Sequence, residues 1–212
     1  MSAAEIAVDE APEMGLRALK KQMTRESLAD AALRLTADKG LDNVTIEEIT
    51  RQAFVSPRTF SNYFSCKEEA VVTAGAQEPR VLVERFSAAA EHSPPLKALC
   101  QVLCEFANSR TKDQLKLMVQ KMELVQQYPS LLPFQAAQYD QLEEELRGAV
   151  ATRTGSDVDT EVYPWLVAAS AVAGIKSAMR LWARSGGDGN RLAELIQDAF
   201  NQISAGLPAP RR

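Results

Sequence analysis

The stretch Val44–Glu69, VTIEEITRQAFVSPRTFSNYFSCKEE, contains three helix-start signals in a short span. In Thr45-Ile-Glu-Glu48 the threonine side chain can accept from a backbone N–H while the glutamate reaches back, which is a capping box. Ser56-Pro57 places a capping side chain just before a proline at the first helical position. Ser65-Cys-Lys-Glu68 has the pattern of a second capping box. The stretch therefore predicts two very short helices followed at once by a third.

The middle helix has a buried face and an outer face. Phe60 and Phe64 are four residues apart, so they share one side of a helix and we expect both to point inward. The residues left for the outer face have one cation, several hydrogen-bonding groups and an aromatic ring: Pro57, Arg58, Thr59, Ser61, Asn62 and Tyr63. Such a set suits groove edges and phosphates better than a protein core.

A longer helix should brace this pair. It runs from about Leu19 or Thr24 to Lys39, and Gly40 supplies its C-terminal stop. The apolar residues Leu41 and Val44 of the connection should tuck under the helices. Two short helices with a tight turn, braced by a longer one, make a helix-turn-helix.

The remainder of the chain also has helical periodicity, and no convincing alternating strand is present. Its most apolar helix is expected over Glu161–Arg184, and the last helix should run from Asn190 to about Ala205. The predicted fold class is therefore all-α. No internal repeat is evident.

Charge is distributed unevenly along the chain. The net charge is −4, yet residues 15–67 contain nine Lys or Arg against six Asp or Glu. The first 14 residues contain four acids and no base. A basic segment on an acidic body suits contact with a polyanion, although so small an excess also arises by chance.

Several classes of protein find no support in the sequence. The only histidine, His92, lies in a probable loop without a nucleophile or metal ligand at a diagnostic spacing, so we expect neither an enzyme nor a metal or cofactor site. Cys100 and Cys104 are one helical turn apart, which favours small core residues over a disulfide. The N-terminus lacks a signal-peptide pattern, and the longest uncharged run, Val162–Ile175, is too short for a membrane span. We therefore expect a cytoplasmic protein.

The segment Arg25–Val71 resembles the DNA-binding domain of the TetR family of bacterial transcription regulators. Order and spacing agree throughout at Gly40, Leu41, Thr45, Val55-Ser56, Thr59-Phe60, Tyr63-Phe64 and Ser65–Glu68. Two positions depart from the family pattern. Phe54 stands where the family usually has glycine, and Ser61 stands where it often has tyrosine. At a positive φ the phenylalanine would be strained, so either the turn differs or the ring has an anchoring contact.

The acidic, alanine-rich composition of the N-terminus predicts a disordered tail at 1–16. The resemblance implies a three-helix DNA-binding domain at 17–68 and a helical effector-binding and dimerisation domain at 69–208. It implies a homodimer on a palindromic DNA operator. The residues it places at the DNA are Lys20, Lys21, Arg25, Thr45, Pro57, Arg58, Thr59, Ser61, Asn62, Tyr63 and Lys67. Ordinary solvated charge is an equal alternative for Lys20, Lys21 and Arg25.

Dimerisation in this family uses the last two helices. The small residues that would permit close approach are Ala168, Ala169, Ala173, Gly174 and Ala178, and the stripe Leu192–Ile203 would supply apolar area. A core within one subunit is the alternative for each of them.

The resemblance also implies an effector pocket in the helical body. Candidate residues for a small hydrophobic effector are Phe106, Met118, Met122, Tyr139, Trp165 and Lys176. Plain core is the alternative for each apolar one. The function implied is a ligand-responsive repressor that the effector releases from DNA. The alternative is a helical ligand-binding or adaptor protein whose helix-turn-helix does not bind operators, and Phe54 and Ser61 are the features that would support it.

Overall fold

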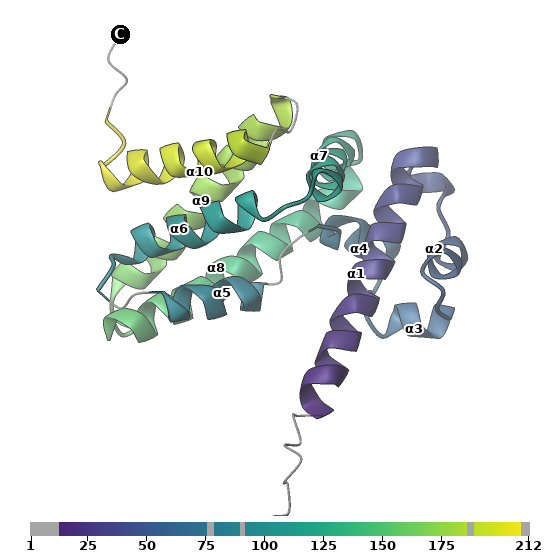
Figure 1. Ribbon diagram of the computed structural model, residues 1–212, viewed down its shortest axis with the longest axis horizontal. Coiled ribbons are helices and arrows are strands. Elements are labelled where there is room, and N and C mark those ends of the chain that lie inside the picture. Colours follow the sequence, from purple (N-terminus) through teal and green to yellow (C-terminus); the bar gives the residue numbers. More distant parts are fainter. Residues whose placement is uncertain (1–12, 76–78, 90–91, 186–188, 209–212) are drawn as a thin grey trace, which may run out of the picture.

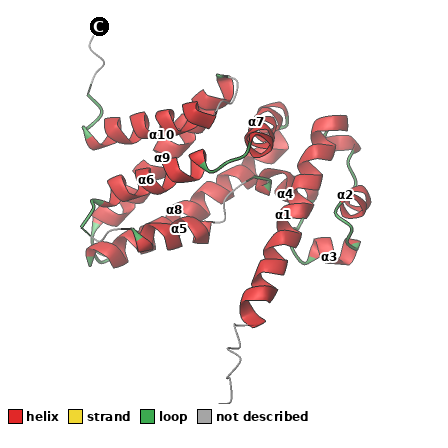
Figure 2. Ribbon diagram, in the orientation of Figure 1, coloured by secondary structure: helices red, strands yellow, loops and turns green. Residues whose placement is uncertain are grey.

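The computed structural model describes residues 13–75, 79–89, 92–185 and 189–208, and within these ranges every regular element is a helix (Figures 1 and 2). The α-helices are α1 (Glu13–Lys39), α2 (Ile46–Gln52), α3 (Pro57–Ser61), α4 (Lys67–Thr73), α5 (Pro79–Ala88), α6 (Pro95–Asn108), α7 (Lys112–Gln127), α8 (Leu132–Thr154), α9 (Val162–Arg184) and α10 (Gly189–Ser204). Two short 3₁₀ turns, Leu41–Asn43 and Pro129–Leu131, precede α2 and α8. The predicted all-α class is confirmed.

The helix-turn-helix lies at one end of the molecule. In Figure 1, α2 and α3 flank α1 on the side away from α5, α6, α8, α9 and α10, and α4 and α7 lie between the two groups. Helix α1 begins at Glu13, earlier than the start near Leu19 or Thr24 that the sequence predicted. Residues 1–12, where the tail was expected, lie outside the described residues.

Local capping chemistry sets the starts of the short helices. The Thr45–Glu48 capping box is present at the start of α2, as predicted, and the Ser56 side chain accepts from the Thr59 backbone N–H at 3.1 Å. The predicted box at Ser65–Glu68 is wrong. Helix α4 begins at Lys67, so Glu69 lies one turn beyond Ser65 and accepts from its backbone N–H at 2.8 Å and from its hydroxyl at 2.7 Å.

Gly40 ends α1 in a conformation and a space that only glycine fits. Its φ is +82°, and a Cβ atom there would lie 2.9 Å from the Tyr128 hydroxyl. Leu41 and Val44, just beyond it, are each 2% exposed, as expected for residues tucked under the helices.

The helix-turn-helix shares its apolar core with α7. The cluster contains residues of α1 to α4, including Leu28, Ile49 and Phe60. It also contains Leu117, Leu124 and Val125 of α7 and Leu131 just before α8. The helix-turn-helix is therefore packed on the rest of the protein and is not joined to it by a linker alone.

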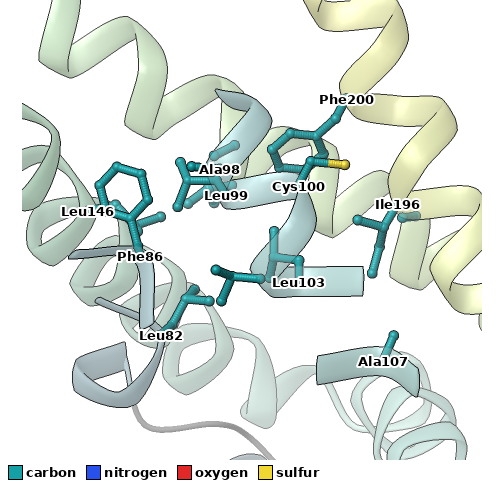
Figure 3. Close-up of a cluster of buried hydrophobic side chains, with 14 of the residues drawn as sticks. Leu82, Phe86, Ala98, Leu99, Cys100, Leu103, Ala107, Leu146, Ile196 and Phe200 are labelled. Carbon is teal, nitrogen blue, oxygen red and sulfur yellow. The ribbon is translucent and has the colours of Figure 1, made fainter. Parts of the chain in front are cut away.

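A second core joins α5, α6, α7, α8, α9 and α10 (Figure 3). The stripe of α10 that was expected to supply a dimer interface is largely used here, because Leu192, Leu195, Ile196 and Phe200 are all buried within the subunit. A Cβ atom on Gly174 would lie 3.2 Å from Phe200, so this glycine lets α9 and α10 approach. Ala168 and Ala178 are also buried within the subunit, which is the alternative that the sequence left open for them.

Helix α9 is, among the described helices, the one long and apolar enough to cross a membrane by length and composition. The core helix of a soluble protein has the same properties. Helix α9 packs against α6, α7, α8 and α10, and the second core contains its side chains Val167, Ala171 and Trp182.

Candidate nucleic-acid interface and ligand cavity

Helix α3 has the two faces that its sequence predicts. Phe60 and Phe64 are 1% and 3% exposed, and their ring centroids are 5.6 Å apart. The opposite side carries exposed Pro57, Arg58, Ser61 and Asn62, with Thr59 and Tyr63 half-buried at its margins. The phenylalanines thus anchor the helix while its polar side chains remain available to a partner.

The turn before α3 keeps the left-handed backbone that glycine usually supplies. Phe54 has a φ of +56°, and its side chain is 95% exposed. Neither alternative raised by the sequence is correct, since the turn has the left-handed conformation and the ring packs on nothing within the subunit.

Other residues predicted to contact DNA lie on α1 and at the start of α2, at different places around α3. Thr45 is exposed at the start of α2, and Lys20 and Lys21 are exposed on α1. Lys21 borders a surface groove together with Asn62 and Tyr63, so it lies beside the C-terminal end of α3. Contact of these residues with DNA stays a prediction.

Lys67 has a bonding role that sequence reasoning missed. Its ammonium group donates to the backbone carbonyls of Leu41 at 2.8 Å and Val44 at 3.0 Å. These bonds tie the start of α4 to the connection between α1 and α2. The predicted phosphate contact of Lys67 is untested, but the side chain is half-buried and already engaged.

Arg25 lies between the helix-turn-helix and the body. Its guanidinium group lies 5.3 Å from the centroid of the Phe64 ring, and the side chain also lines a cavity between α1, α4 and the helical body. The sequence suggested that Arg25 reaches toward the DNA backbone. Its contact with DNA stays a prediction, and Arg25 borders the same surface groove as Lys21 and Asn62. The structure also places Arg25 where a ligand in the body would meet the anchor of α3.

A cavity of about 190 Å³ is lined by helices from both ends of the molecule. Four predicted effector residues line it: Phe106, Met118, Met122 and Tyr139. The sequence did not predict its other walls, which include Arg25, Thr73, Leu82, Leu103, Lys121, Gln135, Gln138, Gln141, Leu142, Ile175 and Met179. Because the lining comes from α1 and α4 to α9, no single helical stripe in the sequence identifies it.

Two predicted effector residues lie outside this lining. Trp165 is 45% exposed, donates its indole N–H to the Val158 carbonyl at 2.8 Å, and has the Arg147 guanidinium 3.8 Å from its ring centroid. Lys176 places its ammonium nitrogen 5.0 Å from the centroid of the Tyr139 ring, so it touches a cavity residue without lining the cavity. Helix α9 has apolar residues on several sides, and periodicity did not show which side faces the cavity.

Lys121 is the buried charge of the cavity wall. The residue is 8% exposed, and burial lowers the pKa of its amine to about 8, with the nearby positive charge of Arg110 acting in the same direction and Asp30 opposing. Among the described residues, Lys121 has no hydrogen-bond or ion-pair partner. Sequence reasoning passed over it, because a single lysine on an amphipathic helix usually lies in solvent.

Two short helices joined by a tight turn, the second with an exposed polar face, have the arrangement found in helix-turn-helix transcription regulators. The sequence model described as "Bacterial regulatory proteins, tetR family" matches residues 28–71, and that of the "MftR C-terminal domain" matches residues 93–208. The chain belongs to the TetR family.

Relatives and solved structures agree with this assignment. The regulator TcmR of Streptomyces glaucescens is 29% identical over 208 residues, which cover 93% of this chain and 90% of TcmR. The fatty acid degradation regulator FadR of Bacillus halodurans has a TM-score of 0.56 at 16% identity, covering 88% of this chain and 97% of that one. FadR of Thermus thermophilus, solved in complex with lauroyl-CoA, has a TM-score of 0.53 at 23% identity, covering 89% and 97%. The two structures share the fold.

Proposed function

We propose that the protein is a ligand-responsive transcriptional repressor that binds a palindromic operator as a homodimer and is released by a small hydrophobic effector. The observation that supports this best is the exposed polar face of α3, held by two buried phenylalanines, one of which touches a side chain of the ligand cavity.

The DNA contact would use α3 in the major groove. Arg58 offers a fork of donors to guanine or phosphate, and Asn62 and Ser61 offer shorter polar groups. The exposed Lys20 and Lys21 of α1 would add contacts to the sugar-phosphate backbone. In a dimer, two copies of α3 would read half-sites about 34–36 Å apart, or further apart on deformed DNA.

The dimer would form through α9 and α10. Although much of the predicted apolar area serves the subunit core, α9 keeps a row of solvent-exposed residues that follow helical spacing: Val162, Leu166, Ala173 and Leu181. The outer face of α10 is polar, with Gln197 and Asn201 joined by a hydrogen bond of 3.0 Å. An apolar strip beside a polar one is the composition of an interface core and its rim.

Release would follow from a change in how α1 and α4 sit on the body. The cavity is lined by Arg25 of α1 and Thr73 of α4, and the Gln138 side chain of α8 donates to the Thr73 hydroxyl at 3.1 Å. A ligand that binds one arrangement of these helices more tightly shifts the dimer toward it. The spacing of the two α3 helices would then no longer match the half-sites.

Selection of bound duplexes from a random pool tests the DNA-binding part of this proposal. We expect a palindromic motif whose affinity falls steeply with salt concentration. Arg58→Ala should weaken binding about tenfold or more, as loss of a bidentate contact does, while the dimer and its helicity persist. Lys97→Ala removes an equal charge from the exposed face of α6 and serves as the matched control. Equal affinity for all duplexes would favour the adaptor alternative.

A further inference from the structure

The described lining of the ligand cavity carries charge of one sign. Among the described residues that line it, Arg25 and Lys121 are cationic and none is an aspartate or glutamate. The rest of the lining is apolar or carries neutral groups, chiefly the amides of Gln135, Gln138 and Gln141 and the Tyr139 hydroxyl. Burial raises the pKa of that hydroxyl, which keeps it neutral at physiological pH.

Lys121 needs a partner that none of the described residues provides. A buried ammonium group loses its hydration, and that loss is normally offset by an ion pair or by several hydrogen bonds. Asp30 of α1 acts on Lys121 through its charge, yet none of the ion pairs within 4.0 Å among the described residues includes either group. Arg110, between α6 and α7, adds a repelling positive charge. Among the described residues, the positive charge of Lys121 is therefore not balanced by an ion pair.

Resting on the function proposed above, we infer that the effector is an amphipathic acid whose single anionic group pairs with Lys121 while its apolar part fills the cavity. A carboxylate would satisfy the lysine, gain from Arg25 along the same wall, and be repelled by no acidic side chain of the described lining. A cationic or neutral apolar molecule would leave the ammonium group unpaired. The apolar part would lie against Phe106, Met118 and Met122.

Two probes of equal chain length test this inference, decanoate and decan-1-ol, with binding measured by calorimetry at pH 7. The wild-type protein should bind decanoate about tenfold or more tightly than the alcohol, as expected for a charge-assisted hydrogen bond. Lys121→Met keeps the length and apolar stem of the side chain, and should abolish this preference without weakening the alcohol. Lys121→Arg keeps the charge and should retain part of the preference. Lys116→Met, at an exposed position of α7, is the matched control.

The preference should also depend on pH in a defined direction. Lys121 is protonated below about pH 8, so the advantage of decanoate should be largest there and should shrink as the pH rises toward 10. The charged groups that act on this lysine are Asp30 and Arg110, with Arg25 on the same wall. Lys121→Met should show no such decline.

Operator binding without ligand separates this inference from the proposed function. If the wild-type protein binds its operator but binds the two probes equally, or binds neither, the anionic-effector inference is wrong and the regulator proposal stands. A decanoate preference that survives in Lys121→Met also overturns the inference. If no duplex is bound specifically, the proposed function fails whatever the probes show.

Discussion

Phe54 holds a left-handed backbone conformation while its ring lies almost wholly in solvent. A non-glycine residue in this region costs on the order of 1–3 kcal/mol, and here no packing within the subunit offsets that cost. Phe54→Gly should therefore raise the free energy of unfolding by roughly 1 kcal/mol, since glycine removes the strain but gains entropy in the unfolded chain.

Urea denaturation measures this change. Phe54→Ala is the control, because it removes the ring but keeps the Cβ atom and its strain, and we expect no comparable gain. A Phe54→Gly protein that is less stable than the wild type would contradict a net cost of the left-handed backbone at this position.

Lys67 has a structural role within the helix-turn-helix, whether or not it also contacts DNA. Its two bonds to the carbonyls of Leu41 and Val44 hold α4 against the loop that leads into α2. Lys67→Met would leave both carbonyls without this donor, and should lower the free energy of unfolding by about 1–2 kcal/mol after allowance for partial exposure. Thermal unfolding of this variant, compared with Lys20→Met on the exposed side of α1, checks the expectation. A weaker DNA affinity of Lys67 variants would therefore not by itself identify a phosphate contact.

At the scale of single elements, α2 owes part of its stability to one carboxylate. Glu48 closes the capping box with Thr45 and accepts a hydrogen bond from the Lys39 ammonium group. The Lys39 bond is the main cause, with the Thr45 backbone bond second, of a pKa lowered to about 2 from its usual 4.5. Because the folded-state pKa is the lower one, the stabilisation is complete above about pH 4.5 and is lost as the pH falls toward 2.

The melting temperature measured between pH 2 and pH 6 tests this dependence. The wild-type protein should lose stability through this window faster than Glu48→Gln, which cannot titrate at that position. Parallel curves for the two proteins would show that the Lys39–Glu48–Thr45 network contributes nothing to the pH dependence.

Helix caps could be predicted from the sequence where the interacting residues are close along the chain. Side-chain orientations that depend on distant helices could not. The caps at Thr45 and Ser56 were predictable, because the donor and acceptor lie three residues apart. The cap at Ser65 was assigned to the wrong glutamate, because the helix begins one residue later than the pattern suggested. The orientation of Trp165 could not be predicted, since α9 is apolar on several sides and only its neighbours decide which side faces inward.

At the scale of the whole molecule, the apolar core of the helix-turn-helix extends across the predicted boundary between the two domains. The sequence placed it after Glu68, and this position stays a prediction. Leu117, Leu124 and Val125 of α7 belong to the same apolar cluster as Phe60 and Phe64. Without α7, the apolar side chains of the helix-turn-helix that pack on it would be exposed to water. This exposure costs about 25 cal/mol of folding free energy for each Å² of apolar surface.

A fragment of residues 13–75 should therefore be largely unfolded in isolation, although it contains the whole helix-turn-helix. Far-UV circular dichroism with urea titration checks this, and the full chain provides the reference. In the full chain, Leu124→Ala should lower the free energy of unfolding by about 2–5 kcal/mol. A cooperative unfolding transition of the isolated fragment would contradict the shared core.

The two sites differ in how much the sequence reveals. The recognition helix and its caps lie within about two dozen consecutive residues, so spacing alone orients Phe60 and Arg58. The cavity is assembled from seven helices that are distant along the chain. Lys121 and Arg25 therefore became recognisable as ligand-facing residues only once α1 and α7 were placed side by side.

The shared core around α7 has a consequence for protein engineering. A hybrid protein could be made by replacing the chain before α4 with the helix-turn-helix of another regulator. The side chains of that helix-turn-helix would then have to pack against Leu117, Leu124 and Val125 of α7. Gly40 and Tyr128 would have to be matched as well, because the tyrosine hydroxyl occupies the space that a larger residue at position 40 would need. A hybrid that folds must therefore replace the packing surface of α7 together with the helix-turn-helix.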